Sequence, residues 1–291
     1  MSVTASMVKE LRERTGAGMM DCKKALVETG GDMDAAVESL RTSGQAMADK
    51  RSGRIAADGR VVVALDGGRA VIAEVNSETD FVAKDENFIA FAEAVAAAAL
   101  AGHAKDVEAL LSDSLADGRT VEAARTELVG KLGENISVRR FARIDADDRL
   151  GAYTHGARIG AVVAISGGDA ALAKDIALHV VAARPLCIDE AGVPAETLEN
   201  ERRILLAQAE ETGKPPEIVA RMVAGRVAKF LKEITLLGQP FVRDPDLPVG
   251  RLLDDAGAKV TEFVRFEVGE GIARKQENFA QEVMAQIEQS G

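Results

Sequence analysis

The residues best suited to recognition chemistry in this chain stand side by side as Thr79, Asp80, Phe81 and Val82. The acidic side chain supplies charge and hydrogen-bond acceptors, and the ring next to it supplies apolar surface that a partner can bury. Aromatic residues are scarce, with nine Phe, one Tyr and no Trp in the chain. The ring either packs back on the following helix as a staple or is held out for a partner. Position alone leaves both interpretations open.

These four residues are expected on the connection between a strand and a helix. Residues 70–75 (AVIAEV) are rich in β-branched side chains and precede two polar residues, which is typical of a strand that ends in a turn. Apolar residues then recur at helical spacing over residues 84–100, and Asp85 lies in the first turn, where an acidic group suits the helix dipole. Because connections run over the surface, we expect Asp80 and Phe81 to be accessible.

A comparison within the chain favours the interpretation that the ring serves a partner. Shifted by 90 residues without a gap, residues 69–85 lie over residues 159–175, and both segments read as strand, small turn, Ala-Lys-Asp and helix. The second segment has Ala170 and Ala171 where the first has the acid and the ring. Two copies of one unit share one packing problem, so packing does not require those two side chains.

No set of residues predicts an enzyme, a cofactor site or a metal site. Residues 16–24 (GAGMMDCKK) superficially suggest a phosphate-binding loop but lack its Gly-Lys-Ser/Thr ending, and no GxSxG turn occurs. Two isolated thiols, Cys22 and Cys187, and three scattered histidines have no metal-ligand spacing. The chain is therefore expected to act by binding, without bond chemistry.

The overall charge favours a protein partner. The chain has 291 residues, of which 47% are hydrophobic and 29% charged, and its net charge is −11. Such a charge opposes binding to a nucleic-acid backbone, whose affinity comes from neutralisation by Lys and Arg. The first residues show no basic-then-apolar leader, and no apolar run approaches the ~20 residues of a membrane span. These features predict a cytoplasmic protein that does not bind membranes.

The first part of the chain predicts three short helices, over residues 4–15, 20–29 and 33–44, that form a small bundle. A helix-turn-helix DNA module is the competing interpretation, but its recognition helix would carry acidic residues that phosphate repels. Met19 and Met20 follow a glycine turn and could offer adaptable apolar contacts, and we expect one of them in the core and the other exposed.

The rest of the chain predicts an α+β protein with antiparallel strands and helices on one face, in an arrangement used twice. A glycine turn joins the first two strands, and His155 lies in a second hairpin turn, where a solvated residue is common. Residues 276–289 predict an amphipathic terminal helix, either docked on the chain or offered to a partner. We divide the chain into a three-helix bundle (1–47), a linker (48–59), a first core subdomain (60–145), a second core subdomain (146–193 and 235–272), a protruding antiparallel helical hairpin inserted in it (194–234), and a C-terminal helix module (273–291).

Five segments resemble the bacterial elongation factor Ts family. They are TDFVAKDENF from Thr79, VKELRERTGAGMMDCKKAL from Val8, HGARIG from His155, GQPFV from Gly238 and FVRFEVGEGI from Phe263. The resemblance implies a guanine nucleotide exchange factor for the GTPase elongation factor Tu, in its GDP-bound and nucleotide-free forms. It also implies that the bundle resembles a ubiquitin-associated (UBA) module.

The same resemblance implies roles for particular residues. Thr79, Asp80, Phe81 and Val82 would disturb the Mg²⁺ and phosphate site of the GTPase, and other contacts would come from Met19, Met20, Lys23 and His155. Two further classes of function are a ubiquitin-like-binding adaptor, which would rest on the bundle alone, and an assembly protein, which would use the helical hairpin. The hairpin also leaves open a homodimer or a two-to-two complex with the GTPase.

Overall fold

Three helices form the first part of the structure, a computed structural model that describes residues 3–273. They are α1 (Ala5–Thr15), α2 (Met19–Glu28) and α3 (Met33–Arg51). The Thr4 hydroxyl caps α1 by accepting from the backbone N–H of Met7, and the Asp32 carboxylate caps α3 in the same way. Their small core contains Leu11, Cys22 and Leu26. The expected three-helix bundle is therefore present, and the expected terminal helix over 276–289 lies outside the described residues.

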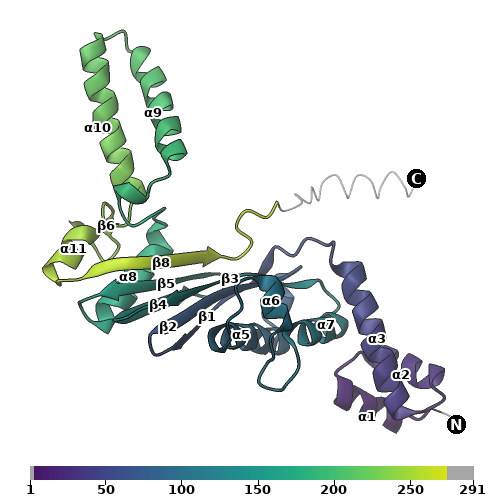
Figure 1. Cartoon of the computed structure of the whole chain (residues 1–291). Helices are drawn as coiled ribbons and strands as arrows, with labels where there is room; N and C mark the ends of the chain where they lie inside the picture. Colours follow the sequence, from purple (N-terminus) through teal and green to yellow (C-terminus); the bar gives the residue numbers. More distant parts are fainter. Residues whose placement is uncertain (1–2, 274–291) are drawn as a thin grey trace, which may run out of the picture.

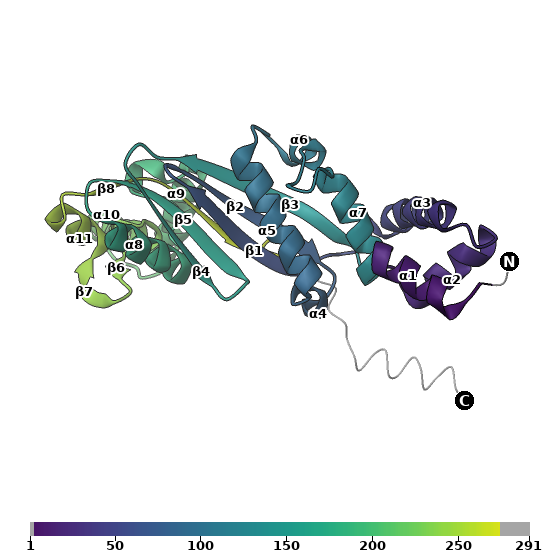
Figure 2. The same ribbon diagram turned by 90° about the horizontal axis from the view of Figure 1, so that it is seen from below.

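The third helix is longer than the sequence predicted. Gly44 does not end it; the helix continues to Arg51, so the first residues of the expected linker 48–59 are helical. Gly44 is buried and faces α7 (Val121–Leu132), where a Cβ added at Gly130 would lie 3.6 Å from the Gly44 Cα. The glycine that we interpreted as a helix stop thus lets two helices pack closely. As a result the bundle lies directly against α7 (Figure 2).

A first antiparallel sheet follows, in the order β1 (Asp58–Asp66), β2 (Arg69–Ser77) and β3 (Ile136–Asp145). The expected glycine turn joins β1 to β2, and Gly67 there has a positive φ of 57°. The middle strand β2 is buried at every position after its first residue, because it has a neighbour on each side and a packed layer on each face. The strand that leads into the Thr79–Val82 run is therefore fixed in place.

Helices cover the outer face of this sheet (Figure 1). The long α5 (Glu86–Ala101) buries Phe88 and Phe91 against β1 and β2, and α7 completes the layer together with the short α6 (Val107–Ser112). The Asp85 carboxylate caps α5 by accepting from the backbone N–H groups of Asn87 and Phe88. The helix predicted over residues 84–100 therefore begins two residues later, after its cap.

A second antiparallel sheet has the order β4 (Arg149–His155), β5 (Ile159–Ser166) and β8 (Lys259–Glu267). Helix α8 (Ala170–Ala183) and the short α11 (Val249–Asp255) cover its outer face. The inner faces of the two sheets pack on each other, with Ile72 and Ile144 from the first sheet in one cluster with Val162 from the second. The α+β architecture with antiparallel sheets is thus confirmed, and two sheets form its middle layers.

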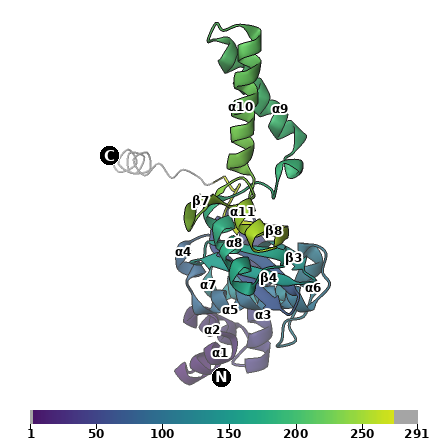
Figure 3. The ribbon, with the colours of Figure 1, turned by 90° about the vertical axis from the view of Figure 1, so that its left-hand side faces the viewer.

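Two helices project from the second sheet as an antiparallel hairpin, α9 (Ala195–Glu210) and α10 (Pro216–Ile234) (Figures 1 and 3). Their mutual contact is narrow, with Leu205, Ala209, Val219 and Val227 as the buried side chains. A short 3₁₀ turn (Glu190–Gly192) leads into the hairpin, and the two-stranded ribbon β6 (Pro240–Phe241) and β7 (Asp244–Pro248) follows it. The base of the hairpin is held by a bond from the Leu186 N–H to the Ile234 carbonyl, 2.7 Å long.

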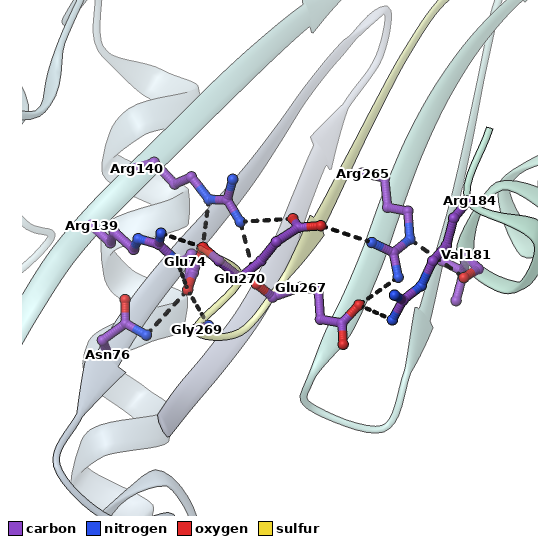
Figure 4. A network of polar contacts seen from close by, with 10 residues as sticks. All are labelled: Glu74, Asn76, Arg139, Arg140, Val181, Arg184, Arg265, Glu267, Gly269 and Glu270. Atoms are coloured by element: carbon purple, nitrogen blue, oxygen red, sulfur yellow. Dashed lines mark hydrogen bonds and ion pairs between the residues drawn. The ribbon is translucent and has the colours of Figure 1, made fainter. Parts of the chain in front are cut away.

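A buried acid joins the first sheet to the turn after β8 (Figure 4). Glu74 of β2 is fully buried, and its carboxylate accepts bonds from Arg139 Nη1 (2.9 Å), Arg140 Nε (2.6 Å) and the Gly269 N–H (2.8 Å). Burial alone would raise the pKa of Glu74, but these donors outweigh it and leave the pKa below its ordinary value. The charged carboxylate therefore fastens the end of the described chain to the first sheet.

Candidate functional site

The run that the sequence singled out forms a one-turn helix, α4 (Asp80–Ala83), between β2 and α5. The Phe81 side chain is 80% exposed, whereas Val82 and Ala83 are buried in the core of the first sheet. Val82 is thus the apolar residue that anchors the turn, and Phe81 points away from it. The staple interpretation of Phe81 is wrong, because a stapled ring would be covered by the helix that follows.

Asp80 stands beside Phe81 on the exposed side of the turn. Its carboxylate pairs with Lys84 Nζ at 2.6 Å, and both side chains are more than half exposed. The hydrogen bond from Lys84 lowers the pKa of Asp80, so the group is charged at neutral pH. The turn therefore presents a ring and a carboxylate together.

The turn is held from outside by an acidic residue that the sequence analysis did not single out. Thr79 caps α4, and the carboxylate of Glu134 accepts from both the backbone N–H of Thr79 (3.0 Å) and its hydroxyl (2.6 Å). Glu134 lies 55 positions further along the chain, in the loop between α7 and β3. The sequence carries no local signal for such a pair, because only the fold brings the two loops together.

A second exposed apolar patch lies on α2. Met19 is 58% and Met20 74% exposed, so the expectation that one of them lies in the core is wrong. Cys22, Ala25 and Leu26 fill the core side of this helix instead. Lys23 is exposed between the methionines and Val27, which is 60% exposed and was missed by the sequence analysis. The signal was available: Val27 follows Met20 by two helical turns and so lies on the same side of α2.

His155 is exposed at the turn between β4 and β5, as expected. The Tyr153 hydroxyl lies 3.3 Å from its Nδ1 atom. The same turn reaches β1, since Arg158 pairs with Asp58 at 2.8 Å and the Ala157 carbonyl accepts from the Val61 N–H. In Figure 2, α2, α4 and β4 follow one another along the lower side of the molecule. The elements that carry the three sets of predicted residues thus lie at separate points along this side.

The ring of Phe81 lies on the surface and is not enclosed. Two surface hollows of about 330 and 480 Å³ lie against α5 and α7 and beside the linker, and neither is lined by α4 residues. Between residues 3 and 273, no three or more His, Cys, Asp or Glu side chains gather into a set that could hold a metal ion. Over the same part of the chain, no helix is both long and apolar enough to cross a lipid bilayer.

An α+β scaffold with exposed apolar side chains at several protruding points is typical of a protein that binds another folded protein. Comparison with known proteins narrows this class. The family model described as Elongation factor TS matches residues 78–270. Curated relatives named Elongation factor Ts include that of Thioalkalivibrio sulfidiphilus, 62% identical over 98% of this chain and 99% of its own length.

Two further relatives carry the same name. The protein of that name from Methylococcus capsulatus is 59% identical over the whole of both chains. The one from Legionella pneumophila strain Paris is 54% identical over 98% of this chain and 99% of its own length. The chain belongs to the elongation factor Ts family, which confirms the resemblance found in the sequence.

Proposed function

We propose that this protein is the guanine nucleotide exchange factor for the translational GTPase elongation factor Tu. It binds the GDP form, disturbs the Mg²⁺ and phosphate site and releases GDP so that GTP can rebind. The observation that carries the proposal is the exposed Phe81 on an anchored turn, in a chain of the elongation factor Ts family. We call Asp80 and Phe81 together the wedge.

Exchange by this route requires differential affinity and no bond chemistry. A protein that binds the nucleotide-free GTPase most tightly must weaken nucleotide binding by the same coupling free energy. Much of the hold on GDP in such GTPases comes from the phosphate loop and from Mg²⁺, which bridges phosphate to protein. Accelerating release a thousandfold means lowering the barrier by roughly 4 kcal/mol. One newly buried aromatic ring, together with a rearranged charge, supplies a free energy of that order.

The two members of the wedge have different tasks. Phe81 supplies apolar surface that is exposed in the free protein and is buried in the partner. Asp80 brings a charged carboxylate, already neutralised in part by Lys84, which can compete for groups that hold the metal. Thr79 and Val82 keep the turn in place, the first as its cap and the second as its buried anchor.

The remaining contacts supply affinity. Met19, Met20 and Lys23 on the UBA-like bundle (1–47) grip the GTPase domain together with the first core subdomain (60–145), and His155 on the second subdomain touches another domain of the partner. We further propose that the two subdomains are copies of one unit, that the hairpin (194–234) supports a homodimer or a two-to-two complex, and that the protein works in the cytoplasm without contacting nucleic acid or membrane.

Release of a fluorescent GDP analogue from elongation factor Tu tests this function. Substoichiometric amounts of the protein should accelerate release, because each molecule leaves after exchange and acts again. The acceleration should shrink several-fold when Mg²⁺ is removed by a chelator, since the metal contact is then already lost. No acceleration in the presence of Mg²⁺ would refute the exchange function. An acceleration that does not change on chelation would refute the disturbance of the metal site alone.

A further inference from the structure

Two loops far apart in the sequence bind each other reciprocally beside the wedge. Glu134 accepts from the N–H and the hydroxyl of Thr79 at 3.0 and 2.6 Å. In return, the Glu78 carboxylate accepts from the backbone N–H of Asn135 at 2.7 Å. Each loop therefore gives a carboxylate to a backbone donor of the other, and bonds to ionised acceptors are the stronger kind.

The helix that carries Phe81 cannot hold its own direction. A single turn of helix carries the full cost of nucleation without the bonds of later turns. The cap bond inside α4, from the Val82 N–H to the Thr79 hydroxyl, is 3.5 Å long and therefore weak. The same hydroxyl donates at 2.6 Å to Glu134, so its shortest contact lies outside the helix. The orientation of the first turn is thus set largely by the neighbouring loop.

The loop that supplies Glu134 is itself placed by the fold. Helix α7 ends at Leu132 and is capped by Gly133, whose φ of 78° lies in the left-handed region that favours glycine, so the chain leaves the helix in a defined direction. At the other end of α4, Arg60 Nη1 donates to the Ala83 carbonyl at 3.3 Å. The turn is therefore held at both ends by side chains from other elements.

The same junction includes the segment that leads from the bundle. The Asn135 side chain donates to the carbonyls of Ser52 (3.4 Å) and Arg54 (2.8 Å), and Arg54 Nη1 lies 3.5 Å from the Glu78 carboxylate. One small group of polar contacts thus joins the wedge, the α7–β3 loop and the connection to the bundle. These contacts add to the packing of α3 on α7, which also places the bundle relative to the first sheet.

We propose that Glu134 is the positioning residue of the wedge: by holding Thr79 it sets the direction in which Asp80 and Phe81 leave the surface. The inference rests on the proposed exchange function and names a residue through which that function is controlled. Glu134 is half-buried beside the wedge and holds Thr79 through two hydrogen bonds. Its loss should therefore change how well bound protein releases GDP, and should change binding much less.

The test compares Glu134→Ala with Glu134→Gln in the full-length protein, at several concentrations, with elongation factor Tu and fluorescent GDP. Small misplacements of a reacting group cost large factors in rate, so we expect the maximal release rate of Glu134→Ala to fall about tenfold or more. The half-saturating concentration should change less than about twofold, because the other contact surfaces are intact. Glu134→Gln should recover part of the rate, since its amide can still bond to Thr79.

Asp169→Ala is the matched control. Asp169 occupies the place of Thr79 in the 90-residue shift and caps α8 through the Leu172 N–H at 2.8 Å. It should lower the melting temperature as any lost cap does, without lowering the maximal release rate. An equal fall in rate for Asp169→Ala would show that lost stability explains the result, and would overturn the proposal.

The double variant Glu134→Ala with Phe81→Ala decides whether Glu134 acts through the ring. In the background of Phe81→Ala, the change Glu134→Ala should slow release by a much smaller factor than it does in the wild-type protein, because only Asp80 is then left to be misplaced. Independent, multiplying effects would overturn the positioning role. If Glu134→Ala does not fold, Thr79→Val removes the shorter of the two bonds to Glu134 and should also lower the maximal rate.

The outcomes distinguish a failure of the positioning role of Glu134 from a failure of the proposed wedge function. If Phe81→Ala releases GDP slowly and Glu134→Ala and Thr79→Val release it normally, the positioning role fails and the wedge stands. If Phe81→Ala itself is normal, the wedge function fails and the inference falls with it.

Discussion

Replacing Phe81 by Ala distinguishes a Phe side chain that stabilises the core from one that is exposed for a partner to bury. A buried Phe replaced by Ala costs about 3 kcal/mol or more of stability, whereas an exposed residue away from special features costs within about 0.5 kcal/mol. With 80% of its surface exposed, Phe81 belongs to the second case. The melting temperature of Phe81→Ala should therefore stay within one or two degrees of the wild-type value.

The same exposure sets the expected loss of function. A Phe side chain offers roughly 150–250 Å² for burial, so an exposed ring that becomes covered contributes about 3–5 kcal/mol as an upper bound. Since Ala keeps part of that surface and the partner can relax, we expect the maximal rate of GDP release to fall by roughly ten- to a hundredfold. Binding should persist, because the contacts that we propose on α2 and at His155 are unchanged.

Two variants calibrate this experiment. Phe88→Ala removes a fully buried ring seven positions away and should lower the melting temperature strongly, which shows that the assay detects a core Phe. Leu65→Ala removes an apolar side chain that is 48% exposed at the far end of β1, and should alter neither stability nor release. A destabilised Phe81→Ala, or a stable one with normal GDP release, would refute the wedge.

Three further changes test other parts of the structure. Met20→Ala combined with Val27→Ala should raise the half-saturating concentration of the protein several-fold in a titration and leave the maximal release rate unchanged. A changed maximal rate would contradict the proposal that α2 supplies affinity and the wedge supplies release. Replacing residues 196–229 by a short Gly/Ser connection should leave exchange by the monomer largely intact, because the hairpin projects away from α4, and complete loss in a folded variant would argue against that layout. Glu74 has a lowered pKa, so its contribution to stability is present above the ordinary Glu pKa of about 4.3 and is lost as pH falls below it. In thermal melts, Glu74→Gln should have a lower melting temperature than the wild type at pH 7, and its melting temperature should decrease less on acidification. Parallel plots of melting temperature against pH for the two proteins would contradict this.

Much of the fold was predictable because the relevant signals are local. The β-branched run over residues 70–75, the glycine turn that joins the first two strands and the apolar periodicity over residues 84–100 are all local patterns, and each formed close to where it was expected. Gly44 misled the prediction because a glycine marks either a helix end or a close helix crossing. The sequence of one helix does not show which partner it meets.

The site was predictable in position and only partly in detail. Residue types and spacing placed Phe81 on a connection, but its exposure depends on whether Val82 or Phe81 faces the sheet, and this follows from the direction of α4. Glu134 was out of reach for a different reason, because its contact with Thr79 joins two loops that only the finished sheet brings together. Residues that hold a recognition loop are thus harder to read from a sequence than the residues that the loop displays.

The Glu74 contacts also have a consequence for the order of events during synthesis. Glu74 receives its bond from Gly269, which follows 195 positions later, and the inner face of its sheet is covered by Val162 and Phe266 of the second sheet. Synthesis adds about 5–20 residues per second, so the first sheet, complete at Asp145, waits roughly 6–25 seconds for Gly269 with this apolar face exposed to water. Strand β8, the last strand within residues 3–273, therefore covers the first sheet made, and a chain truncated before residue 269 would lack the Gly269 donor to Glu74.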